Sequence, residues 1–189
     1  MSIRPALLSD HHAVARLIQA ALDTITSNFS GEEDREDNPA RYLWLENLFQ
    51  QTGNRFSYQQ ILVKEVEHQV VGAILTYHGS EIEALDRPLN ERLRRLRHDP
   101  TITLEREAEL DEFYIDALAV SPAFSGRGYG TALIRAAEQQ AQERHYPKIA
   151  LNVDEHNQHA YQLYQRLGYQ TDKLRVLYGE KFFHMVKYL

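Results

Sequence analysis

Hydrophobic positions in the first part of the chain predict a strand, two helices and a hairpin. Residues 3–6 have the pattern of a short strand, and the following apolar residues, up to position 21, recur at the spacing of one helix face. Apolar residues in 42–49 indicate a second helix. Residues 61–66 and 70–77 have strand patterns, and the polar turn between them predicts a β-hairpin.

A polar segment at 79–109 interrupts this pattern. Three of its leucines are spaced for one face of a helix: Leu89, Leu93 and Leu96. Asp86 can cap this helix, and Pro88 then lies in its first turn, where proline is tolerated. The segment therefore predicts a helical insertion between two strands.

The rest of the chain alternates strand and helix patterns. The predicted elements are a strand at 113–120, a helix at 129–144, a strand at 149–153, a helix that ends at Gly168, and strands at about 170–178 and 181–188. The sequence contains no internal repeat and no linker-like stretch. We therefore expect one domain that spans residues 1–189.

Three alternate glycines follow the strand at 113–120 and precede the next helix: Gly126, Gly128 and Gly130. The first N–H groups of a helix have no intrahelical partner, and the helix dipole adds partial positive charge there. Glycine lets the backbone approach an anion closely and tolerates positive φ. A structural turn explains one glycine easily and three alternating ones poorly, so the loop predicts a phosphate site.

Two common phosphate motifs fit this loop poorly. The dinucleotide motif G-x-G-x-x-G places its first glycine directly at the strand end, whereas here five residues separate Val120 from Gly126 and the spacing is G-x-G-x-G. A Walker A loop needs Lys-Ser or Lys-Thr after its last glycine, and neither is present. A nucleotide-binding oxidoreductase is therefore disfavoured.

Two stretches of the chain carry a family resemblance. The first, LAVSPAFSGRGYGTALI at 118–134, is similar to a strand, a Pro-containing loop and the signature [Arg/Gln]-x-x-Gly-x-[Gly/Ala], with Ser125 at the position of Arg or Gln. The second, at 157–169, has an Asn, an Ala, a Leu-Tyr pair and a final Gly-Tyr where Gly-Phe is usual. In this order and separation the two motifs resemble the GNAT superfamily of N-acetyltransferases, which bind acetyl-CoA.

The resemblance implies a fold. It is an α/β (α+β) fold with a central mixed, mostly antiparallel sheet of six to seven strands flanked by helices. The segment at about 79–109 is then a helical insertion between the third and fourth strands.

The resemblance also implies acetyl-CoA as co-substrate. The strand that ends at Val120 would offer its backbone to the pantetheine arm, and the glycine loop would bind the pyrophosphate. The implied cofactor-binding residues are Leu118, Ala119, Val120, Ser125, Gly126, Arg127, Gly128, Tyr129, Gly130, Thr131, Asn157 and Tyr164. Arg166 is a further candidate for the outer phosphate.

Direct acetyl transfer to an amine needs a base and an acid. A lysine-like amine with a pKa of about 10.4 costs roughly 4 to 5 kcal/mol to deprotonate at pH 7. By the resemblance, Tyr164 is the general acid for the leaving thiolate; the alternative is a buried core tyrosine. Strand alternation places five side chains on one face: Glu112, Tyr114, Asp116, Leu118 and Val120. Asp116 is the preferred base and Glu112 the second candidate, although a structural carboxylate would explain either.

The composition and charge of the chain limit the cellular compartment and the kinds of partner that we expect. The chain has no cysteine, which excludes disulfides, thiolate catalysis and cysteine-bound zinc. A formal net charge of -6 argues against sequence-independent nucleic-acid binding and is compatible with a cationic substrate. The acidic run at 31–38 is typical of a solvated segment or of one that attracts cations. No membrane span or secretory signal is evident, so we expect a cytoplasmic protein.

We expect no metal. His156 and His159 are spaced i, i+3 but have no identifiable third ligand, and the pair His11 and His12 is expected on the surface at a helix start. The predicted function is an N-acetyltransferase that acts on a primary amine of a small molecule or protein. The alternative is a non-catalytic acyl-CoA-binding regulatory module. A homodimer through the last strands or the insertion is plausible.

Overall fold

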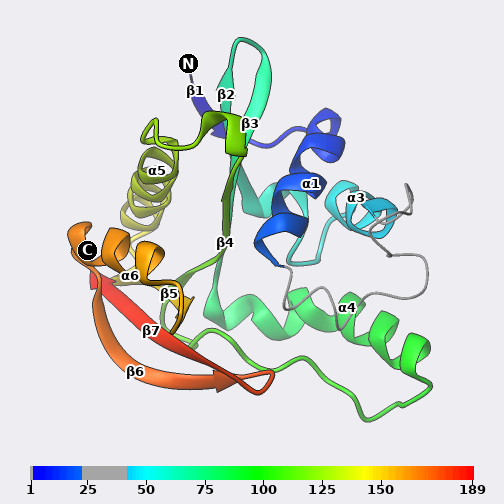
Figure 1. Ribbon diagram of the computed structural model, residues 1–189. Helices are drawn as coiled ribbons and strands as arrows, with labels where there is room; N and C mark the ends of the chain where they lie inside the picture. The colour runs from blue at the N-terminus through cyan, green and yellow to red at the C-terminus, as the bar shows by residue number, and fades with distance from the viewer. Residues whose placement is uncertain (1, 23–41) are drawn as a thin grey trace.

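Figure 1 shows the computed structural model of the chain, which describes residues 2–22 and 42–189. The acidic run at 31–38 lies outside the described residues. None of the helices in these two ranges combines the length and the apolar character that crossing a membrane requires.

One sheet of seven strands organises the described chain (Figure 1). The strands are β1 (Ser2–Pro5), β2 (Ile61–Val66), β3 (Gln69–His78), β4 (Phe113–Val120), β5 (Lys148–Asp154), β6 (Gln170–Leu177) and β7 (Glu180–Tyr188). Their order across the sheet is β1-β2-β3-β4-β5-β7-β6, and only β4 and β5 are parallel neighbours. This confirms the predicted mixed, mostly antiparallel sheet flanked by helices.

Helices cover both faces of the sheet. The helices on one face are α1 (His11–Ala21), α3 (Leu43–Gln50) and α4 (Ile82–Arg97), whose apolar side chains form one core with β2, β3 and β4. The helices on the other face are α5 (Tyr129–Glu143) and α6 (Gln158–Arg166), which form a second core with β4, β5 and β7. The central strands β2 to β5 are therefore buried between two layers, whereas most residues of β6 are exposed.

Two tight turns set the register of the two hairpins. Glu67 and His68 join β2 to β3, and both have positive φ, 50° and 63°. Tyr178 and Gly179 join β6 to β7 with φ of 53° and 84°. Two-residue turns with both φ values positive match the right-handed twist of antiparallel strands, so both predicted hairpins form.

Helix α4 begins earlier than the sequence predicts. It starts at Ile82, so Pro88 lies inside the helix and Asp86 is not its cap. A proline inside a helix costs about 3 kcal/mol, which is why the pattern favours a start near Pro88. Burial of Ile82 and Leu85 in the first turns offsets this cost. At the other end Leu96 is 42% exposed, so the predicted leucine face is buried only in part.

The connection from α4 back to β4 packs tightly against the start of α4. Gly79 donates its backbone N–H to the carbonyl of Glu112 at 2.9 Å. A Cβ at position 79 would collide with the carbonyl of Glu109, so only glycine fits this close approach of two backbones. The contact places residues 107–112 beside the sheet, where Glu107 is buried.

Candidate functional site

The functional site begins where β4 and β5 separate. The two strands pair at three positions only, from Phe113 and Ile149 to Ile115 and Leu151. Beyond this point β4 continues along β3, whereas β5 continues along β7. A cavity of about 550 Å³ opens in the split, with residues of β4 on one wall and of β5 and α6 on the other.

A β-bulge in β4 lies at the mouth of the split. Leu75 of β3 pairs with Ala117, and the next residue, Thr76, pairs with Ile115. Asp116 is therefore an extra residue that has no partner on β3. Bulges bend a strand and re-aim its side chains, and they recur next to active sites.

The bulge changes which side chains of β4 share a face. Tyr114 packs in the core that contains α1, α3 and α4, whereas Leu118 and Val120 pack against the core that contains α5 and α6. The prediction that these three residues lie on one face is wrong, because one extra residue shifts the period-2 alternation. Leu118, Ala119 and Val120 are half-buried along the edge that β5 has left.

The glycine loop has the geometry of an anion site. Gly126 and Gly128 have φ of 73° and 76°, and Gly128 directly precedes α5. A Cβ at either position would meet no atom within 4 Å, so the requirement for glycine comes from the backbone conformation and the space above the loop is open. Gly130 is already helical, and a Cβ there would make ordinary contacts with Leu118 and Val120 at 3.9 Å.

Side chains around this loop add positive charge. Arg127 is exposed, with its guanidinium carbon 5.1 Å from the ring centre of Phe124. The ammonium of buried Lys64, on β2, lies 5.2 Å from the ring centre of Tyr129, the first residue of α5. Lys64 was not among the residues predicted from the sequence, because nothing in its strand pattern links it to a loop 60 positions away. Ser125 is exposed beside Gly126.

Helix α6 brings two predicted residues to the cavity. Asn157 and Tyr164 both line it. The side-chain oxygen of Asn157 accepts a hydrogen bond from the N–H of Ala160 at 3.0 Å and caps the helix, so its amide nitrogen is not engaged in the cap. Tyr164 is buried, and burial raises the pKa of its hydroxyl to about 12.

Behind the bulge lies a buried ion cluster around Arg55. Arg55 donates from Nε to Oδ2 of Asp116 and from Nη2 to Oδ1, both at 3.0 Å. It also donates to Oε1 of Glu107 at 3.2 Å and to the hydroxyl of Tyr77 at 2.8 Å. Oδ1 of Asp86 is 3.5 Å from Nη1. Three carboxylates therefore face one guanidinium.

This buried cluster holds more carboxylates than cations, which affects the protonation of Asp116 and Asp86. Burial raises the pKa of Asp116 to about 7, and Glu107 adds to the shift while Arg55 opposes it. Burial also raises the pKa of Asp86 above its usual range. Asp116 lines the cavity, but its side chain is only 1% exposed, so its carboxyl group lies directly behind the wall of the split.

Two residues of the cavity wall, Glu107 and Tyr178, and Arg55 behind it were not predicted from the sequence. Arg55 lies in a polar stretch without periodicity, Glu107 in the connection after α4, and Tyr178 in the β6–β7 turn. Glu107 and Tyr178 line the cavity, and the hydroxyl of Tyr178 donates to Oε1 of Glu107 at 3.4 Å. Only tertiary contacts join these segments, which is why no local pattern reveals them.

Other predicted residues lie elsewhere. Glu112 is fully buried away from the cavity, where its Oε1 is 3.3 Å from Nε2 of His184. Arg166 is exposed in the last turn of α6 and is not part of the cavity wall. His159 lines the cavity, whereas His156 is exposed beside Glu155, so these two histidines do not face a common point.

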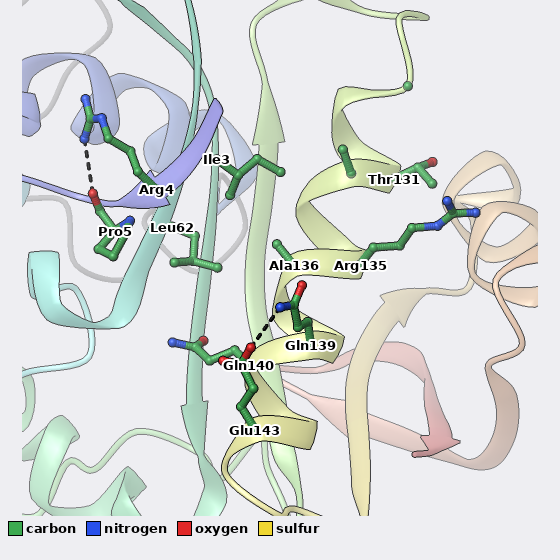
Figure 2. Close-up of a pocket in the computed structure, with 12 residues that line it drawn as sticks. Ile3, Arg4, Pro5, Leu62, Thr131, Arg135, Ala136, Gln139, Gln140 and Glu143 are labelled. Atoms are coloured by element: carbon green, nitrogen blue, oxygen red, sulfur yellow. Dashed lines mark hydrogen bonds between the residues drawn. The ribbon is translucent and has the colours of Figure 1, made fainter. Parts of the chain in front are cut away.

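Figure 2 shows a second groove, of about 690 Å³, between β1, β2 and α5. Thr131 and Arg135 line it from α5, and Ile3 and Leu62 line it from the strands (Figure 2). It meets the glycine loop at Gly128 and Thr131. Tyr164 and Asp116, the residues predicted to act in catalysis, line the cavity in the split and not this groove.

Solved structures similar to the chain include two acetyltransferases. One crystal structure, described as an acetyltransferase, is 27% identical, and the match covers 100% of this chain and 99% of that one with a TM-score of 0.80. An N-acetyltransferase from Staphylococcus aureus Mu50 is also 27% identical, with coverage of 99% and 100% and a TM-score of 0.78.

Curated relatives match over shorter stretches. Mycothiol acetyltransferase from Thermobifida fusca (strain YX) is 33% identical over 82 residues, which is 43% of this chain and 25% of that protein. The chain spans less than half the length of the curated relatives it matches, with shares of 42%, 25% and 27%. The model of the acetyltransferase (GNAT) family matches residues 18–169. Since this match covers most of the chain, and the sheet, the split and the glycine loop agree with it, the chain belongs to the GNAT acetyltransferase family.

Proposed function

We propose that the chain is an N-acetyltransferase that moves the acetyl group from acetyl-CoA to a primary amine by direct attack in a ternary complex. One observation carries the proposal: the cavity between the separated β4 and β5 contains Tyr164 and lies on the sheet beside a positive-φ glycine loop. A glycine loop suited to an anion and a buried tyrosine hydroxyl, both near β4, support this function. Membership of the GNAT family supports the same assignment.

Acetyl-CoA would bind along β4. The edge of β4 beyond Ile115 no longer pairs with β5, so its backbone is available to the amide groups of a pantetheine arm. The pyrophosphate would lie on the first N–H groups of α5, from Tyr129 to Thr131, with Gly126 and Gly128 shaping the loop. The side-chain amide of Asn157 remains able to donate to the arm from across the cavity.

Tyr164 would supply the proton for the leaving group. The amine nitrogen attacks the thioester carbonyl, the C–S bond breaks, and the thiolate takes the proton of the Tyr164 hydroxyl. A pKa of about 12 keeps this hydroxyl protonated at neutral pH. A thiol has a reference pKa of about 8.5, so its thiolate is a weaker base than the phenolate of a water-exposed tyrosine. The thiolate therefore needs only modest assistance from an acid as it leaves.

Asp116 would receive the proton that the attacking amine loses, directly or through water. Its pKa of about 7 suits a base that works near neutral pH, since it is ionised in part yet able to hold a proton. The two hydrogen bonds from Arg55 fix the orientation of the carboxylate. They also give Asp116 a structural role, which the experiments below separate from catalysis.

The charge of the cavity favours a cationic amine. The acidic residues that line it are Glu107, Asp116 and Asp154. Arg55 lies behind the wall and pairs with Glu107 and Asp116, but Asp86 faces it too, so the carboxylates outnumber this cation. An ammonium group, or an amine with a second positive charge, is therefore attracted, whereas an acidic amine is repelled. Buried carboxylates strengthen the discrimination because they are screened little by solvent.

The first prediction concerns substrate choice. With acetyl-CoA and a panel of primary amines, thiol release should be faster for dicationic amines than for amines with a carboxylate, by at least about tenfold in kcat/KM, since a charged hydrogen bond contributes roughly 1.5 to 3 kcal/mol. Acetyl-CoA binding without turnover of any amine would instead support a regulatory module. Preference for acidic amines would contradict the proposed substrate class.

Gly128→Ala should weaken acetyl-CoA binding at least tenfold in Kd measured by calorimetry. A side chain at φ of 76° costs about 1 to 2 kcal/mol, and relief of that strain would turn the N–H groups away from the phosphate. Gly53→Ala is the matched control, because Gly53 has φ of 75° and the same open space but lies outside the loop. Equal Kd values for the two variants would remove the loop from the binding site.

Tyr164→Phe should lower kcat by about 10²- to 10⁴-fold with little change in acetyl-CoA affinity, because it removes the acid and keeps the ring. Tyr161→Phe, one turn away on α6, is the control: its hydroxyl bonds to Thr171 at 3.1 Å and is not part of the cavity wall. Steady-state turnover with the best amine provides the measurement. A Tyr164→Phe enzyme as fast as the Tyr161→Phe enzyme would exclude Tyr164 as the acid.

Asp116 should leave a signature in the pH profile. A carboxyl with a pKa of about 7 is protonated below that pH and cannot act as base, so kcat/KM should rise with pH through about 7. Asp116→Asn should remove this inflection and leave only the later rise from the amine itself. If the thermal midpoint falls but the inflection near pH 7 persists, Asp116 is structural and the base lies elsewhere.

A further inference from the structure

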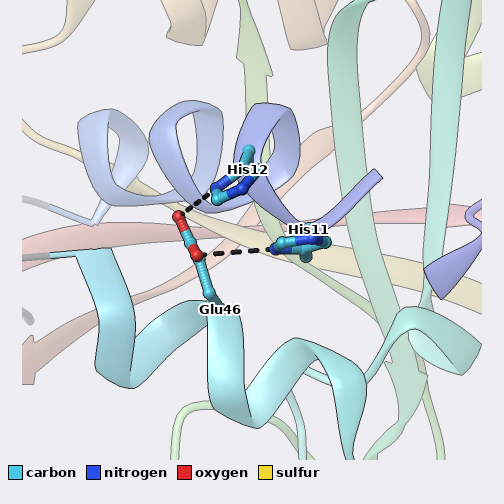
Figure 3. A group of neighbouring side chains, drawn as sticks. All are labelled: His11, His12 and Glu46. Atoms are coloured by element: carbon cyan, nitrogen blue, oxygen red, sulfur yellow. Dashed lines mark hydrogen bonds and ion pairs between the residues drawn. The ribbon is translucent and has the colours of Figure 1, made fainter. Parts of the chain in front are cut away.

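A cluster of two histidines and one glutamate lies away from the active cavity, where α1 packs on α3. Figure 3 shows His11 and His12, which begin α1, both directed at Glu46 of α3. Nδ1 of His12 is 2.8 Å from Oε1 of Glu46, and Nδ1 of His11 is 3.5 Å from Oε2. One ligand atom from each residue lies within 4.8 Å of the other two.

The structure changes the expected position of the histidine pair. Both residues were predicted on the surface, and the side chain of His12 is 71% exposed. The side chain of His11 is only 24% exposed, because α3 packs beside it. The sequence of α1 alone does not predict this contact. Its Nδ1 is buried and has no hydrogen-bond partner. This nitrogen points toward the carboxylate of Glu46 but makes no hydrogen bond with it.

Glu46 is the second element of the argument. Its side chain is 12% exposed, and burial of a carboxylate is unfavourable unless positive charge or hydrogen bonds compensate it. The ion pairs described for Glu46 within the two described ranges are those with His11 and His12. A cation bound between the three side chains would compensate the buried carboxylate and give the unpaired Nδ1 of His11 a partner.

The ligand set selects the kind of cation. Imidazole nitrogen and carboxylate oxygen together suit zinc and similar transition metals, whereas magnesium and calcium prefer oxygen ligands alone. Tetrahedral zinc with bonds of about 2.0 to 2.2 Å places ligand atoms roughly 3.3 to 3.5 Å apart. Nδ1 of His11 lies 3.5 Å from Oε2 of Glu46, and Nδ1 of His12 lies 2.8 Å from Oε1, so an ion between the imidazoles would bind both carboxylate oxygens or require the carboxylate to turn.

We propose that His11, His12 and Glu46 form a binding site for a divalent transition metal of the zinc type, with a water in the fourth position. The ion ties the first turn of α1 to α3. The last turn of α1 lines the active cavity through Ala20 and Ala21, about 15 Å along the helix at 1.5 Å per residue. The metal therefore has a structural role: it fixes the helix that forms one wall of the cavity, and it does not touch the reacting groups.

The test is a titration of the metal-stripped full chain with Zn²⁺ alone, followed by calorimetry and thermal unfolding. One equivalent should bind, and the unfolding midpoint should rise by about 5 to 10 °C at a hundredfold excess over Kd. Mg²⁺ at the same concentration should give no shift. His12→Ala and Glu46→Gln should each weaken Zn²⁺ binding at least tenfold, and the unfolding midpoints without metal report whether either variant is misfolded.

His68→Asn is the matched control. Its imidazole is fully exposed and lies 4.0 Å from Glu65, so it offers a histidine and a carboxylate without burial or a third ligand. Asparagine is suited to the positive φ of 63° at this position. Zn²⁺ affinity should be unchanged in this variant. Absence of saturable Zn²⁺ binding to the unaltered chain, or affinity that persists in both His12→Ala and Glu46→Gln, would overturn the proposal.

Discussion

The separation of β4 from β5 is the constraint on which the rest of the site depends. Parallel pairing ends at Ile115 and Leu151, and beyond that point each strand has a partner on its outer side only. The sheet thus loses a row of backbone hydrogen bonds in its middle. Unpaired backbone groups at such depth are costly, and a ligand that pairs with them recovers the loss. The split is stable as a binding site because the outer neighbours β3 and β7 hold both strands in place.

The bulge at Asp116 and the side chain of Arg55 maintain this geometry together. The extra residue bends β4 at the position where it leaves β5, and Arg55 holds the carboxylate of that residue with two hydrogen bonds. Burial of an ion pair is costly, so the cluster is not explained by stability alone. Burial raises the pKa of Asp116 to about 7, and Glu107 adds to this shift, which links the support of the strand to the chemistry proposed for the cavity.

The cavity wall and the ion cluster behind it are assembled from segments that are distant along the chain. Arg55 follows α3, Glu107 follows α4, and Tyr178 belongs to the last hairpin turn. The close backbone approach at Gly79 positions the connection that carries Glu107. The last turn of α1 also lines the cavity, and the first turn of this helix contacts Glu46 of α3. The composition of the cavity wall therefore depends on how the helices on one face of the sheet pack.

Local patterns in the sequence determined the strands, the helices and the glycine loop, because periodicity, turn residues and positive-φ glycines act over a few neighbouring positions. The loop at Gly126 and Gly128 and the cavity positions of Asn157 and Tyr164 follow from such signals together with the family motifs. Tertiary structure alone decided the start of α4, the bulge that reverses the faces of β4, and the burial of Arg55 beside Asp116. Each of these depends on interactions between segments far apart in the chain. Burial of Ile82 offsets the cost of a proline inside α4, the bulge forms in the pairing of β4 with β3, and Asp116 compensates the buried charge of Arg55. The packing of α3 on His11 is a further contact of this kind. Local sequence patterns do not reveal these long-range interactions.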